Sequence, residues 1–121
     1  MNKAQAIHKF WSSFGIPAYD QYTVPQDAQM PYITYDLSES DFDYATPMSA
    51  SVWYRSQSWE DITLKCCDIS RSLAGGGRVF RVDNGFVWIF KRRPFSQRMS
   101  DTDDMVRRMV INVYVDYFTR Y

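Results

Sequence analysis

The sequence of 121 residues has only one histidine and two cysteines, and the cysteines are adjacent, at Cys66 and Cys67. Adjacent cysteines lack the two-residue spacer of zinc and redox motifs, and a single pair does not make a disulfide framework. We therefore expect a reducing, cytoplasmic compartment. The apolar runs are only a few residues long, and the N-terminus lacks the basic-then-apolar pattern of a signal peptide, so we expect no membrane partner.

Few residues have the pattern that catalysis or a cofactor requires. His8 lies beside an apolar helical stripe, which is typical of a boundary residue. The glycines Gly75–Gly77 follow a helix, whereas a phosphate-binding loop precedes one. Asp101, Asp103 and Asp104 lack the glycine and distal glutamate of an EF-hand. We expect no catalytic residues, no cofactor and no metal; a metal-dependent hydrolase that uses these three aspartates is an alternative.

The charges balance, with 14 basic and 14 acidic residues, and this balance argues against a sequence-independent nucleic-acid binder. They are nevertheless separated along the chain. Residues 1–61 hold three basic and eight acidic side chains, a net charge of −5, and residues 62–121 hold eleven and six, a net charge of +5. Such a chain can associate head to tail with its own copies, although simple solvation of both halves explains the pattern as well.

The periodicity predicts a single α+β domain over residues 1–121, with the element order α-β-β-α-β-β-β. We expect a mostly antiparallel sheet of about five strands with two helices on one face. The helices are expected at about 2–14 and 58–74, and the strands at about 31–38, 48–56, 78–82, 86–90 and 106–118. The first two strands should pair antiparallel. Alternation predicts that the core face of the last strand consists of Met109, Ile111, Val113, Val115 and Tyr117. The segments 15–31 and 91–104 are interpreted as an extended connection and a polar connection.

Several side chains are assigned to the core from this pattern. Tyr22 should anchor the extended connection, and Ser58 should cap the second helix. The strand from Phe86 to Phe90 is apolar at every position, which predicts that both of its faces are covered. The second helix has an apolar stripe that should face the sheet, formed by Trp59, Ile62, Cys66, Ile69 and Leu73.

Aromatic residues make up 17% of the chain, more rings than a core of this size readily holds. Tyrosine and tryptophan are favoured at protein interfaces, and we expect some rings at subunit contacts. The outer faces of the long strands supply the candidates Trp53, Tyr114 and Phe118. A basic loop is a second candidate surface, for nucleic acid or an acidic partner or simply for solvent, and it contains Lys91, Arg92, Arg93 and Arg98.

Five stretches, in order and across nearly the whole chain, carry a resemblance to a known family: FWSSFGIPAY, TVPQDAQMPYITYDLS, SASVWYRSQSWEDITLK, DNGFVWIFKRRPFSQRMSD and VINVYVDYF. The sequence resembles the tail terminator group of long-tailed phages and prophages of Gram-positive bacteria. These proteins are also called tail completion or minor capsid proteins.

The resemblance implies a structural virion protein that is assembled in the host cytoplasm. Six copies would form a ring that caps the tail tube, contacts the major tail tube protein and the head-completion protein, and lets DNA pass. The acidic connection with Glu39, Asp41 and Asp43 would then face the lumen or the adjacent tube ring, although a solvated hairpin tip fits it equally. Another ring protein of the neck and a small nucleic-acid-binding adaptor are the alternatives.

Overall fold

The computed structural model describes residues 1–37 and 45–119. The helices are α1 (Lys3–Trp11), a short 3-10 turn η1 (Ser12–Phe14) and α2 (Glu60–Ser72). The strands are β1 (Ala18–Asp20), β2 (Tyr32–Tyr35), β3 (Thr46–Arg55), β4 (Arg78–Val82), β5 (Gly85–Met99) and β6 (Val106–Thr119). The α+β composition is as predicted, but the described residues form six strands rather than about five.

The six strands form one sheet in the order β1-β2-β3-β6-β5-β4. The predicted antiparallel pairing of β2 with β3 is confirmed, and the other pairs are antiparallel except β1 with β2. The additional strand is β1, which lies in the segment predicted to be an extended connection. A strand of three residues is too short to show an alternating pattern in the sequence. It pairs in parallel with Ile33–Tyr35 of β2.

Helix α1 begins at a capping box, in which the Asn2 side chain accepts a hydrogen bond from the Gln5 N–H at 2.8 Å and the Gln5 side chain accepts one from the Asn2 N–H. The chain leaves η1 through Gly15 at φ +81°, a left-handed conformation that favours glycine. For α2 the predicted cap is wrong by one residue. Trp59 is the N-cap, and the Ser58 hydroxyl accepts a hydrogen bond from the Glu60 N–H.

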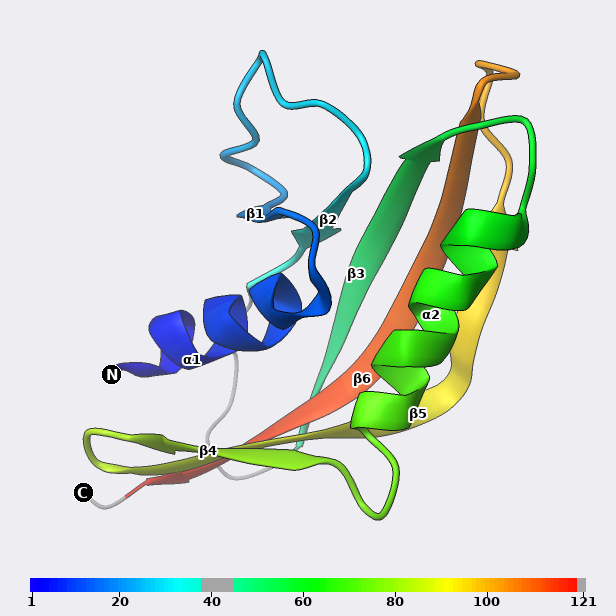
Figure 1. Cartoon of the computed structure of the whole chain (residues 1–121). Coiled ribbons are helices and arrows are strands. Elements are labelled where there is room, and N and C mark those ends of the chain that lie inside the picture. Colours follow the sequence, from blue (N-terminus) through cyan, green and yellow to red (C-terminus); the bar gives the residue numbers. More distant parts are fainter. Residues whose placement is uncertain (38–44, 120–121) are drawn as a thin grey trace.

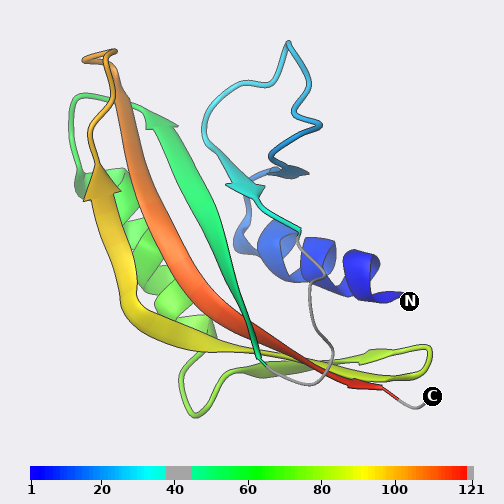
Figure 2. The same cartoon turned by 180° about the vertical axis from the view of Figure 1, so that it is seen from behind.

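The sheet curves strongly, and α2 lies in front of β5 and β6 in Figure 1 and behind them in Figure 2. The stripe predicted on α2 is confirmed, because Ile62, Cys66, Ile69 and Leu73 are buried and Trp59 packs against them. Buried side chains of both helices join one cluster with alternate residues of the strands. On β6 these are the predicted ones, Met109, Ile111, Val113, Val115 and Tyr117.

Candidate interaction surface

We call the sheet face turned away from the buried cluster the outer face. Its residues follow from the alternation of side chains along each strand. On β5, for example, Val87 and Ile89 are buried in the cluster, so Phe86, Trp88 and Phe90 project from the opposite side. The curvature of the sheet makes this the convex side of its long strands in Figure 2.

Five aromatic side chains gather where β5 and β6 run together, and we name them the outer aromatic row: Phe86, Trp88, Phe90, Tyr114 and Phe118. Trp88 stacks on Phe90 with ring centroids 4.2 Å apart, and Phe90 meets Tyr114 at 5.4 Å. Phe86 and Phe118 remain 48% and 51% exposed. The prediction that both faces of 86–90 are covered is therefore wrong at Phe86. Trp88 and Phe90 are half-buried, and the Trp88 indole N–H donates to the Gly76 carbonyl at 2.7 Å.

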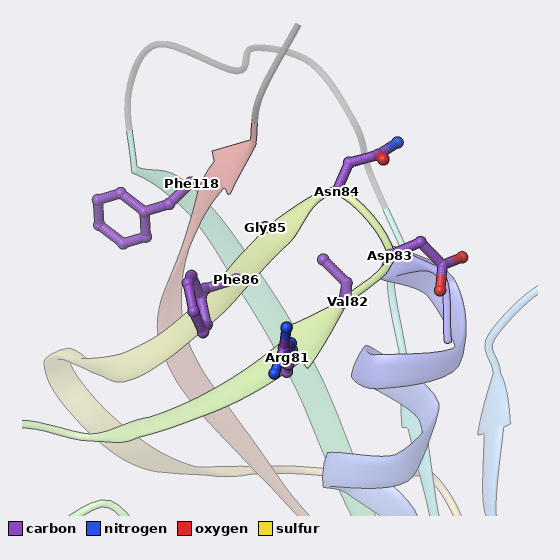
Figure 3. A pocket seen from close by; sticks show the side chains of 7 residues that line it. All are labelled: Arg81, Val82, Asp83, Asn84, Gly85, Phe86 and Phe118. Atoms are coloured by element: carbon purple, nitrogen blue, oxygen red, sulfur yellow. The ribbon is translucent and has the colours of Figure 1, made fainter.

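The row ends in an open hollow of about 790 Å³ at the β4–β5 turn. The hollow is lined by Phe86, Phe118, Arg81, Val82 and the turn residues 83–85. Figure 3 shows Phe86 and Phe118 on the same side of the hairpin with Arg81 beside Phe86, while Asp83 and Asn84 point away. Aromatic rings next to an exposed guanidinium suit a partner side chain that is both apolar and polar.

Trp53, predicted as an interface anchor, lies on the outer face but is half-buried and already engaged within the chain. Its indole N–H donates to the Thr34 hydroxyl at 2.9 Å, and the Arg108 guanidinium lies 4.7 Å from the ring centroid. The ring centroid of Tyr32 lies 6.5 Å from that of Trp53. Of the three predicted anchors, Tyr114 and Phe118 thus belong to the aromatic row, and Trp53 belongs to a separate cluster.

The predicted basic loop is not a loop, because β5 continues through it to Met99. A shift of register between Lys91 and Ser96 against β6 absorbs the irregular segment. Arg92 is part of the fold: its Nη2 donates to the Ser49 hydroxyl at 3.2 Å and to Asn112 Oδ1 at 3.0 Å.

The other three basic residues do not form one patch with Arg92. Lys91 donates to the Ser70 hydroxyl of α2 at 2.7 Å, and Arg98 lies 4.7 Å from the ring centroid of Trp59. Arg93 is exposed. The structure thus ties Lys91 and Arg98 to the helix side and leaves Arg93 as the freely accessible cation of the predicted set.

The aspartates of the 101–104 turn serve the local backbone. Asp101 accepts a hydrogen bond from the Asp103 N–H, Asp103 accepts one from the Met105 N–H, and Asp103 also pairs with Arg55 at 3.5 Å. Within residues 1–37 and 45–119, no group of three or more metal-ligating side chains converges. The acidic residues Glu39, Asp41 and Asp43 lie outside the described residues.

Burial raises the pKa of side chains that pack on the core side of the sheet, Cys66 and Tyr35 among them. Burial raises the pKa of the Cys66 thiol to about 12, with a smaller effect from Cys67, and Cys66 lies 3.7 Å from the Met109 sulfur. Burial, followed by the charge of Asp20, raises the pKa of Tyr35, whose hydroxyl is 3.1 Å from His8 Nδ1. These are properties of packed side chains on the core side.

Sequence reasoning missed one prominent surface residue, Tyr22. It was expected to anchor its segment, yet its side chain is 79% exposed. The turn is held by Asp20, which accepts hydrogen bonds from the Tyr22 N–H at its side chain and from the Thr23 N–H at its carbonyl. A signal was present in the aspartates and prolines around Tyr22, which are typical of exposed turns.

Searches with family models and among curated proteins find no match to this sequence. A solved chain from a structure described as the virion of a native gene transfer agent (GTA) particle has a similar fold. The TM-score is 0.55 at 13% identity, and the match covers 87% of this chain and 81% of that one. The likeness shows a shared fold over most of both chains. Among the described residues, no helix is both long and apolar enough to span a bilayer.

Proposed function

We propose that this chain is a structural protein of a phage-like virion. The observation that carries the proposal is the fold it shares, over 87% of its length, with a chain of a gene transfer agent virion. Virion proteins of this kind act through contacts rather than through chemistry, and the outer aromatic row offers such a contact. Tyr, Phe and Trp rings that are half-exposed on a rigid sheet are typical anchors of protein interfaces.

Within the virion, we propose that the chain is a tail terminator. Copies would form a ring that caps the tail tube, with the major tail tube protein on one side and the head-completion protein on the other. The number six comes from the family resemblance. Glu39, Asp41 and Asp43 would face the lumen or the tube, where their negative charge would repel passing DNA. We propose no enzymatic activity.

A ring protein of the neck is the second candidate, because it would use the same fold and the same apolar surface. The structure weakens the third candidate, a nucleic-acid-binding adaptor. Two of its four basic residues, Lys91 and Arg92, are hydrogen-bonded within the chain, and Arg98 lies over a ring. They are therefore less available to phosphates than a solvated loop would be.

The test is to inactivate the gene in the element that encodes it and to examine the particles by electron microscopy. A tail terminator should leave tails of irregular length that are not joined to heads. A neck protein should leave tails of normal length and separate heads. Normal joined particles would contradict both proposals.

A further inference from the structure

We infer that the Tyr22 loop, residues 20–31, of one copy docks in the hollow at the β4–β5 turn of the next copy. This inference rests on the proposed function and names the contact by which the copies associate. The starting point is Tyr22, whose 79% exposure exceeds that of every other large apolar or aromatic side chain in the described residues. A tyrosine held outward by a hydrogen-bonded turn is prepared to bury its ring in a partner.

The Tyr22 loop carries negative charge. Asp20 and Asp27 flank Tyr22, and the sequence contains no lysine or arginine from residue 10 to residue 54. Asp27 is exposed and Asp20 is half-buried. The partner surface should therefore combine aromatic rings with positive charge.

The hollow has this combination. Phe86 and Phe118 are paired neighbours on β5 and β6, and both are about half exposed. Arg81 pairs with Phe86 across β4 and β5 and is exposed. Within the described part of the chain its guanidinium makes no hydrogen bond or ion pair. The nearby carboxylate of Asp83 is 2.6 Å from the N-terminal amine, which offsets its charge. The hollow thus offers two rings and a free guanidinium to an acidic aromatic loop.

The two surfaces lie at opposite ends of the molecule. Figures 1 and 2 place the Tyr22 loop at the upper end and the β4–β5 turn in the lower part, and the two views agree. A contact between them joins unlike surfaces of two copies, so each copy offers both halves of the contact. Such head-to-tail association closes into a ring or grows into a filament. The Tyr22 loop belongs to the acidic half of the sequence and the hollow to the basic half, so this contact brings the two halves of neighbouring copies together.

The experiment is disulfide trapping in the full chain. Gln21→Cys and Asn84→Cys, exposed neighbours that leave Tyr22 and Phe86 in place, are combined in a Cys67→Ser background, which removes the exposed native thiol and leaves buried Cys66. Oxidation over a rising protein concentration should give a ladder of linked multimers. Each single variant should stay unlinked, and an equal mixture of the two should stop at dimers. Thiol labelling checks that both introduced cysteines react, and reactive cysteines without a ladder would overturn the contact.

Charge reversal supplies an independent measurement. Asp27→Arg or Arg81→Asp, added to the trapping variant, should slow ladder formation about tenfold, because like charges then face each other. The two reversals combined should restore the rate of ladder formation, because opposite charges then face each other again. Leu64→Ala is the matched control, since Leu64 is exposed at 56% on α2, away from both surfaces. Equal ladders from all these variants would overturn the assigned contact.

These outcomes separate this inference from the proposed function. Rings seen by electron microscopy without the ladder would refute the Tyr22 contact and leave the virion role standing. A charge-dependent ladder from a chain whose loss leaves normal particles would support the contact and refute the virion role.

Discussion

Arg92 and Asn112 are joined across neighbouring strands of the outer face, where Arg92 Nη2 donates a 3.0 Å hydrogen bond to Asn112 Oδ1. The Ser49 hydroxyl donates to the same oxygen at 2.8 Å, and Asn112 Nδ2 donates to the Pro94 carbonyl at 2.7 Å. Asn112 is only 6% exposed. The network therefore ties β3, β5 and β6 together where β5 changes register, and it explains how a polar side chain is accommodated on the sheet.

Arg92→Ala should lower the free energy of unfolding by about 1–3 kcal/mol, because it removes a charged donor from a nearly buried amide. Arg93→Ala is the matched control. Arg93 is the exposed neighbour, and its loss should change stability by less than about 0.5 kcal/mol. Urea unfolding of both variants measures the difference. Equal costs would show that the network does not depend on Arg92.

Ile62→Ala should cost about 2–5 kcal/mol, because Ile62 is 0% exposed beneath the sheet and its truncation leaves a cavity. Leu64→Ala removes a similar side chain from the same helix at a position that is 56% exposed, and it should cost far less. The two variants are compared by urea unfolding. Similar costs would contradict the assignment of the buried stripe.

The pKa of the Cys66 thiol is raised by burial from 9.0 to about 12, so the folded protein keeps a proton that the unfolded chain loses. Its contribution to stability is complete below pH 9 and is lost as pH rises toward 12. We expect the unfolding free energy to fall through this interval, and to fall less steeply in Cys66→Ala. Urea titrations at several pH values measure the slopes, and identical slopes would contradict the prediction.

The sequence predicts those helices and strands in which apolar residues recur at a regular spacing and form a single buried face. The alternation from Met109 to Tyr117 predicted the buried face of β6, and the spacing from Ile62 to Leu73 predicted that of α2. The continuation of β5 beyond Phe90 could not be predicted. A run of basic residues followed by Pro94 is typical of a loop, and only the register shift against β6 keeps the segment in the sheet.

The candidate surface was predictable only in part. The excess of rings indicated exposed aromatics, and Tyr114 and Phe118 do lie in the outer aromatic row. Which rings are exposed depends on what covers each sheet face, and a single sequence does not specify this. The predicted cover over Phe86 and the predicted anchoring by Tyr22 are therefore wrong, because both residues are exposed.

Replacing Glu39, Asp41 and Asp43 together by lysine tests the proposed position of the acidic connection. If these side chains face the lumen or the tube, the triple variant should hamper tail joining or DNA ejection because lysines attract phosphates. The variant should unfold in urea like the wild type, which separates a functional effect from misfolding. Wild-type infectivity in a complementation assay would refute the position.

Trp53→Ala and Phe118→Ala should separate stability from assembly. Trp53 is half-buried, donates to Thr34 and packs beneath Arg108, so its loss should cost about 1–3 kcal/mol of stability. Phe118 is 51% exposed beside the hollow, so its truncation should cost less than about 1 kcal/mol but should weaken association of the copies. Urea unfolding measures the first quantity, and disulfide trapping between residues 21 and 84 measures the second. If Phe118→Ala leaves trapping unchanged at full stability, Phe118 does not contribute to this contact. If it destabilises the protein as much as Trp53→Ala does, the ring belongs to the core.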